Sequence, residues 1–374
     1  MAVYKLFPLK DATLYSKYPA KNTGLDEIIE CSTTYTNLDP NPEVSRILLQ
    51  FEQEQIVDVI NNKISGSNFE VSLKLFQAYI SGLNKDTTLK IYPISQSWNM
   101  GTGRDANVPE TQNGVCWRFT DYSGSTQWNL PGNGFNTTSS YKASNPGGGV
   151  WFFNSPVNSS SLTSSYQFNY YNPLDLSADV TNIVNHWRSG SISNNGFIIK
   201  QDNSSEFVPS SSYDTEIKYF SRDTHTIYPP VLEFKWNDYS FNTGSSSQSI
   251  IGVNQIIVSI LNNQGFYNEN DVERFRINIK KLYPERVYST SSLYLTDYYL
   301  PQNSYYAIKD LDTNEYIIDF DNNYTRISAD STGSYFDIYM NGLEPERYYS
   351  LLVKTTIAGS TTIIDDNNYF KITT

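Results

Sequence analysis

The chain has 374 residues, which is enough for two or three domains of ordinary size. Its formal net charge of −12 disfavours nucleic acid and anionic membrane surfaces as partners, and no stretch approaches the roughly 20 apolar residues of a membrane span. The 30 Tyr, 19 Phe and 6 Trp, with only 18% charged residues, suit half-buried strands, so the composition predicts an all-β protein.

The N-terminus and the cysteines bear on the cellular compartment. Residues 1–8 (MAVYKLFP) lack the basic and long apolar regions of a signal peptide, so we expect synthesis in a cytoplasm. Cys31 and Cys116 fit that compartment as unpaired thiols, with a disulfide between them as the alternative.

Short alternating runs between Gly, Asn, Pro and Ser clusters fill the first 236 residues. They predict strands at 13–16, 46–51, 71–76, 88–92, 196–200 and 231–236. Many short strands joined by polar loops favour a jelly roll or another β-sandwich.

One segment of this part has helical periodicity instead. Val180, Ile183, Val184 and Trp187 share one face of a helix, which Ser177 or Asp179 can cap at its start and Gly190 at its end. This predicts one short amphipathic helix against a sheet, and residues 54–62 show a weaker pattern of the same kind.

A second domain is predicted beyond a linker. Residues 237–248 are rich in Asn, Ser and Gly, and strands follow at 274–279, 305–308, 316–320, 335–339 and 348–355. We therefore predict a jelly-roll domain at 1–236, a linker at 237–248 and an immunoglobulin- or fibronectin-like sandwich at 249–374, formed as one domain or two.

The first domain resembles the DNRLRE-type domain, a jelly-roll relative of carbohydrate-binding modules. The similarity is carried, in the family's order, by the opening strand 11–15 (DATLY), the strand 46–51 (RILLQF), the loop 98–103 (WNMGTG), the segments 114–117, 126–128 and 131–135, the helix 179–187, the strand 195–199 and the closing strand 228–234 (YPPVLEF). The resemblance implies a binding or structural module, and it allows a structural calcium ion without indicating its ligands.

The remainder resembles two further groups. Residues 343–349 (LEPERYY) are similar to the tyrosine corner of immunoglobulin-like sandwiches, in which Tyr349 would donate a hydrogen bond back to the loop. Residues 1–30 resemble the start of virion structural proteins of tailed bacteriophages.

Catalytic patterns are weak throughout. His186 and His225 are accompanied by no Gly-x-Ser-x-Gly elbow, no P-loop and no close-spaced Cys or His pairs, so we expect no catalytic residues and no enzyme. The 39 Asp and Glu residues make accidental carboxylate pairs certain, so such pairs indicate no glycosidase.

Two candidate sites for ligands stay open. Residues 310–314 and 319–323 carry the Asp-x-Asp-x-Asn spacing of a calcium loop, but strands flank both, which favours Asx-rich turns. Trp98, Trp117, Trp128 and Trp151 lie in or beside Gly-rich loops, where they either stack on a glycan or pack together as a minor core.

These patterns lead to two functional hypotheses. The first is a non-enzymatic virion structural protein of a tailed bacteriophage, a head-decoration, fibre or tail-associated component made in the host cytoplasm and located in the virion. Its partners would be other virion proteins (capsid, fibre or tail), with a homo-oligomer also open. The alternative is a carbohydrate-binding module that adheres to a host surface glycan.

Overall fold

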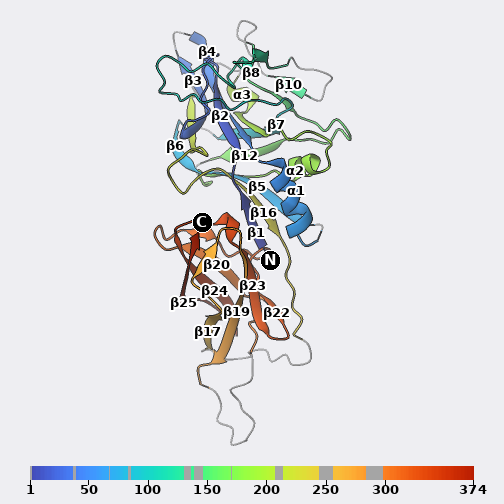
Figure 1. The fold of residues 1–374 in the computed structure, drawn as a ribbon, viewed down its shortest axis with the longest axis vertical. Coiled ribbons are helices and arrows are strands. Elements are labelled where there is room, and N and C mark those ends of the chain that lie inside the picture. Colours follow the sequence, from blue (N-terminus) through green and yellow to red (C-terminus); the bar gives the residue numbers. More distant parts are fainter. Residues whose placement is uncertain are drawn as a thin grey trace, which may run out of the picture. The chain divides into compact units, whose positions relative to one another are not determined.

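The computed structural model consists mainly of strands, which confirms the predicted all-β fold (Figure 1). It describes residues 2–36, 39–66, 68–82, 86–129, 136–138, 146–169, 171–206, 214–243, 256–283 and 298–374. The chain forms two compact units. We call residues 6–63 and 70–233 the N-terminal unit, and residues 1–5, 64–69 and 234–374 the C-terminal unit.

The N-terminal unit is built on a large curved sheet. Its strands follow the order β12-β7-β14-β4-β3-β15-β6, and β2 also pairs with β4. Their bounds are β2 (Lys10–Tyr15), β3 (Ile28–Thr36), β4 (Asp39–Gln50), β6 (Gln77–Ser81), β7 (Thr87–Pro93), β12 (Ser164–Phe168), β14 (Phe197–Gln201) and β15 (Thr215–Phe220).

The remaining strands of this part of the chain form smaller sheets. One sheet has the order β1-β16-β5-β13, and two further pairs are β8 with β9 and β10 with β11. Their bounds are β1 (Ala2–Leu6), β5 (Phe69–Leu75), β8 (Phe119–Asp121), β9 (Thr126–Gln127), β10 (Asn136–Thr138), β11 (Val150–Phe152), β13 (Leu176–Asp179) and β16 (Val231–Trp236).

Helices are short, as expected. Helix α2 (Thr181–Arg188) buries Ile183, Val184 and Trp187, and the ring of Trp187 lies 4.6 Å from that of Phe197 on β14. Asp179 accepts a hydrogen bond from the backbone of Thr181, while Gly190 ends the helix with a φ of +72°. The weaker pattern at 54–62 gives α1 (Gln53–Asp58) and a π-helical turn, η1 (Val59–Lys63). The single turn α3 (Asn203–Glu206) has no apolar periodicity and was not predicted.

The C-terminal unit is an immunoglobulin-like sandwich, as predicted. One sheet has the order β17-β19-β23-β22 and the other β18-β25-β24-β20-β21, which match the A-B-E-D and A′-G-F-C-C′ sheets of that fold. Strand β18 runs parallel to β25, as A′ does to G. The bounds are β17 (Ile256–Leu261), β18 (Phe266–Asn268), β19 (Val272–Lys281), β20 (Tyr305–Asp310), β21 (Tyr316–Ile318), β22 (Ser328–Asp330), β23 (Gly333–Tyr339), η5 (Met340–Gly342), β24 (Tyr348–Ile357) and β25 (Ser360–Thr373).

Aromatic side chains fill the core of this sandwich. The rings of Tyr306 and Phe336 stack at 4.5 Å, and Phe275 lies 5.7 Å from Phe336. The Tyr349 hydroxyl donates to the carbonyl of Glu344 at 2.9 Å, which confirms the predicted tyrosine corner. Of the segment interpreted as a linker, residues 244–248 lie outside the described residues, and Phe241 forms a β-bridge with Ala329.

Candidate functional site

The four tryptophans singled out in the sequence lie in the N-terminal unit, and all are buried. Their exposed fractions are 5% (Trp98), 0% (Trp117), 7% (Trp128) and 3% (Trp151). They pack in one apolar cluster on the face of the large sheet that also presents Leu48 and Ile198. A sugar stacks on an exposed ring face, which none of these indoles offers, so their role in this structure is packing.

The indole N–H groups of Trp98 and Trp128 are also hydrogen-bonded within the fold. The N–H of Trp98 donates to the carbonyl of Asn195 at 2.9 Å, and that of Trp128 donates to the carbonyl of Cys116 at 3.0 Å. Buried indoles normally find such partners. Cys116 and Cys31 are both free and buried, as expected for unpaired thiols, and burial raises the pKa of each.

Two of the tryptophans, Trp117 and Trp151, lie beside a buried cluster of charges. Arg46 on β4 donates through Nε and Nη2 to the two carboxylate oxygens of Glu206, at 3.1 and 2.9 Å. The Lys200 ammonium lies 2.9 Å from the same carboxylate, and the side chains of all three are at most 1% exposed. The Arg46 guanidinium lies 4.7 Å from the ring centroid of Trp117 and 5.7 Å from that of Trp151.

This charge cluster was missed by the sequence analysis, which used Arg46 only as part of a strand pattern. Its partner Glu206 is 160 positions away in a polar segment, so no local spacing signals the pair. Burial lowers the pKa of Lys200, and the neighbouring Glu206 carboxylate opposes that shift. Because its groups are engaged with one another and buried, we interpret the cluster as structural.

The two calcium-like loops are turns stabilised by their own backbone. Asp310 accepts hydrogen bonds from the N–H groups of Asp312 and Thr313 at 2.8 and 2.9 Å, and its carboxylate also pairs with Arg347. Asp321 accepts from the N–H of Asn323 at 2.7 Å. The Asp310 carboxylate is thus occupied by donors, including a cation, and does not fit a calcium ion. The interpretation as Asx-rich turns is correct.

In the N-terminal unit, the buried carboxylate of Asp11 on β2 is the strongest remaining candidate ligand for a structural cation. It is 1% exposed, its Oδ2 accepts from the N–H of Arg222 at 2.7 Å, and its Oδ1 has no hydrogen-bond partner. Within the described ranges, however, no three His, Cys, Asp or Glu side chains gather to hold a metal. Burial, with a smaller contribution from Asp223, instead raises the pKa of Asp11 to about 7.

This raised pKa makes stability depend on pH. In the unfolded chain an aspartate titrates near 3.9, so between about pH 4 and pH 7 the folded chain holds a proton that the unfolded chain has released. Stability therefore falls as pH rises through that window. We expect the wild-type chain to lose about 2 kcal/mol of unfolding free energy from this group between pH 5 and pH 7.

The Asp11→Asn variant should lack this loss, because an amide does not titrate. Urea unfolding of both proteins at pH 5 and pH 7 measures it, with the exposed Asp86→Asn as a control that keeps the wild-type decrease. An equal decrease in wild type and Asp11→Asn would show that Asp11 is ionised in the folded chain.

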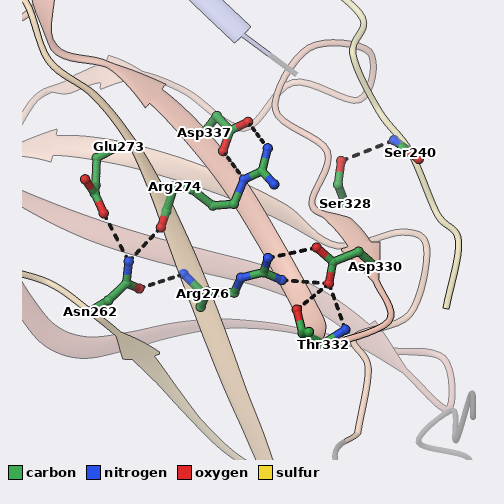
Figure 2. Close-up of polar contacts among 9 residues, drawn as sticks. All are labelled: Ser240, Asn262, Glu273, Arg274, Arg276, Ser328, Asp330, Thr332 and Asp337. Atoms are coloured by element: carbon green, nitrogen blue, oxygen red, sulfur yellow. Dashed lines mark hydrogen bonds and ion pairs between the residues drawn. The ribbon is translucent and has the colours of Figure 1, made fainter.

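The C-terminal unit presents an ordered polar surface on its β17-β19-β23-β22 sheet (Figure 2). Arg274 donates to the two carboxylate oxygens of Asp337 at 2.7 and 2.9 Å, and Arg276 donates to those of Asp330 at 2.7 and 2.8 Å. Both guanidinium groups also lie over the ring of Tyr335, at 4.1 and 5.2 Å from its centroid. We call these five residues the Arg–Tyr face.

Neighbouring groups fix these arginines further. Asp330 also accepts from the backbone and hydroxyl of Thr332, at 2.9 and 2.6 Å. The hydrogen bonds from Arg276, with those from Thr332, hold the pKa of Asp330 well below its usual range. At the end of β17, Asn262 donates to Glu273 and to the carbonyl of Arg274 and accepts from the N–H of Arg276 (Figure 2). The two guanidinium planes are therefore held in place within the unit.

Exposed aliphatic side chains border the Arg–Tyr face. Strand alternation places Ile257 and Leu261 outward on β17, with Leu261 paired in register with Arg276, and Val272 outward on β19. Their exposed fractions are 48%, 47% and 53%. The surface thus combines rigid arginines, a tyrosine ring and apolar side chains.

Comparisons with known proteins indicate no family. No family model and no curated protein matches the chain. Among solved structures, it is similar to a DUF4785 family protein from Legionella pneumophila, at 9% identity and a TM-score of 0.16. That match covers 100% of this chain and 62% of the other, and a TM-score this low supports no conclusion. Among the described helices, none has the length and hydropathy needed to cross a membrane.

Proposed function

We propose that this chain is a non-enzymatic structural protein of a tailed-bacteriophage virion, a head-decoration, fibre or tail-associated component. The Arg–Tyr face of the C-terminal unit is the observation that carries an assembly role. This face would contact another virion protein. The resemblance of residues 1–30 to virion structural proteins is the reason for proposing a bacteriophage particle as the assembly.

The composition of this face supports an assembly role. Arginine and tyrosine are enriched where protein interfaces bind most strongly, and the aspartate pairs fix the arginine side chains in advance. Less side-chain entropy is then lost on binding than with free arginines. Ile257, Leu261 and Val272 add apolar area that a partner would remove from water.

Mass spectrometry of density-purified particles, from lysates of cells that make this chain, tests the proposal. We expect recovery in a fixed ratio to the capsid protein, and a high copy number would favour decoration over a tail part. Leu261→Asp should reduce the copies per particle at least tenfold, since it buries a charge in the interface. The matched control is Val157→Asp, which changes a side chain that is 72% exposed in the other unit. Absence of the wild-type chain from particles would contradict the proposal.

A second candidate function is adhesion to a host surface glycan. A glycan binder needs exposed aromatic faces, and the buried tryptophans do not provide them. Exposed aromatic side chains are found instead on the β18-β25-β24-β20-β21 sheet of the C-terminal unit. A glycan array probed with the whole chain tests this alternative, and a failure to bind any glycan would contradict it.

A further inference from the structure

The outward surface of the β18-β25-β24-β20-β21 sheet carries large aromatic side chains exposed to solvent. The exposed fractions are 60% for Phe266, 46% for Tyr316, 47% for Tyr348 and 42% for Tyr369. The alternate residues Tyr267, Tyr349 and Phe370 lie in the core, so strand alternation directs Phe266, Tyr348 and Tyr369 to one face. The register shift between β20 and β21 pairs Tyr316 with Lys309 on that face. We call this surface the aromatic face.

The strand register arranges lysines between these rings. In one row across the sheet, Lys371 pairs with both Phe266 and Tyr348. In the next outward row, Lys309 pairs with Tyr316 on one side and with Ser350 on the other, and Ser350 pairs with Tyr369.

A third row with a lysine lies further along the strands, beyond the row of Leu352 and Asp365. Lys354 pairs with Tyr305 on one side and with Ile363, which is 52% exposed, on the other. Neighbouring strands lie about 4.8 Å apart, so Tyr316 and Tyr369 are separated by roughly 14 Å, with Lys309 between them. Three rows thus set an ammonium group beside a tyrosine ring, namely Lys371 beside Tyr348, Lys309 beside Tyr316 and Lys354 beside Tyr305. The row between the last two holds Leu352 and the exposed Asp365 and has no lysine.

Two of these lysines have no acidic partner among the residues that the structure describes. Lys371 pairs with the carboxylate of Glu346, but no carboxylate among the described residues pairs with Lys309 or Lys354. The Lys354 ammonium lies over the rings of Phe320 and Tyr305, at 4.7 and 5.2 Å from their centroids. The row that holds Lys309 also contains Ser350, whose Oγ is buried without a hydrogen-bond partner.

From this arrangement we propose that the aromatic face binds an acidic polysaccharide, a chain of sugar rings that carry carboxylate groups. The sugar rings stack on the exposed faces of Tyr316 and Tyr369, and a carboxylate pairs with Lys309 between them. In a uronic acid the carboxylate is fixed to the same ring that stacks, which matches a cation set within a row of aromatic rings. A phosphodiester polymer carries its charge between the rings instead.

Other occupants fit this face less well. Lysine is depleted in the core of protein interfaces, yet three rows of this face contain one. A nucleic acid would meet a chain of net charge −12 along its whole backbone. The same net charge repels a polyuronate, but charges farther away than about 8–10 Å are screened at ordinary ionic strength, whereas Lys309 acts at contact distance.

This inference is independent of a virion role, because it concerns binding by the isolated full-length chain. It does rest on the glycan-adhesion alternative, for which it names the surface and the ligand class. If a variant with an altered aromatic face still bound the glycan array, glycan adhesion would be supported and the assignment of binding to the aromatic face would be wrong.

Affinity electrophoresis or calorimetry with polygalacturonate, in calcium-free buffer, tests the proposal. We expect the wild-type chain to bind, and binding to its fully methyl-esterified form to be at least tenfold weaker, because esterification removes the charge and keeps the ring. The double variant Lys309→Gln/Tyr316→Ala should raise the Kd at least tenfold. Its matched control, Lys280→Gln/Tyr171→Ala, changes exposed residues off this face and should bind like wild type.

Three outcomes would overturn the proposal. They are an equal Kd for the double variant and wild type, equal binding of the charged and esterified polymers, and binding to a sugar-phosphate polymer with none to polygalacturonate. If the double variant does not fold, Lys309→Gln alone changes only a surface ammonium, and an unchanged Kd for it would count equally against the role of Lys309.

Discussion

Replacing Glu206 by glutamine is expected to lower the free energy of unfolding of the N-terminal unit by about 3–5 kcal/mol. Glutamine keeps the shape of the side chain and removes its charge. The positive charges of Arg46 and Lys200, at most 1% exposed, would then remain in the interior without the carboxylate that they share. Removing one partner of a buried ion pair costs more than the pair itself contributes, because the remaining charge stays desolvated.

Tryptophan fluorescence during urea unfolding measures this effect. All tryptophans except Trp236 belong to the N-terminal unit, and Trp117 and Trp151 lie over the Arg46 guanidinium. The matched control is Glu216→Gln on β15, which removes an ion pair with Lys218 whose side chains are 37% and 31% exposed. Such a surface pair contributes about 0–1 kcal/mol. Equal losses in the two variants would show that the buried cluster does not stabilise the unit.

Features set by short-range chemistry were predictable from the sequence. Helix α2 was found because Ile183, Val184 and Trp187 share one helical face, and the tyrosine corner because Leu343 to Tyr349 specify one loop. The strand pattern gave the all-β fold, since alternation of apolar and polar residues is itself a local property.

Features that depend on which distant segments meet were not predictable. The loop position of the four tryptophans left open whether they bind or pack, because their burial results from contact with Leu48 and Ile198 on strands far away in the sequence. The sequence around Arg46 and the sequence around Glu206 contain no pattern that indicates their pairing. The aromatic face arises from the register of β18, β21, β24 and β25, whereas each of its tyrosines alone resembles any other strand residue.

The glycines of the loop WNMGTG are explained by a residue outside the loop, Asn22. Asn22, fully buried, donates through Nδ2 to the carbonyls of Met100 and Val115 at 2.7 and 2.8 Å. Its Oδ1 accepts from the N–H of Gly103 at 2.7 Å. A side chain at Gly101 would place a Cβ 2.4 Å from Oδ1 of Asn22, and Gly101 has a φ of +76°, so glycine is required there.

Asn22→Ala is accordingly expected to destabilise the N-terminal unit by about 3 kcal/mol or more, since each buried polar group left without a partner costs roughly 1–3 kcal/mol. The variant would leave the carbonyls of Met100 and Val115 and the N–H of Gly103 without the bonds that Asn22 makes. Urea unfolding followed by tryptophan fluorescence measures the loss, because Trp98 begins the same loop.

Asn113→Ala provides the matched control for this prediction. Asn113 lies in the same loop region and also bridges it, accepting from the N–H of Thr102 at 3.0 Å and donating to its hydroxyl at 2.6 Å. It is only half-buried, so water can replace both bonds and the expected loss is below about 1 kcal/mol. If the two alanine variants lost the same stability, the loop would be held by its backbone alone and Asn22 would not be its anchor.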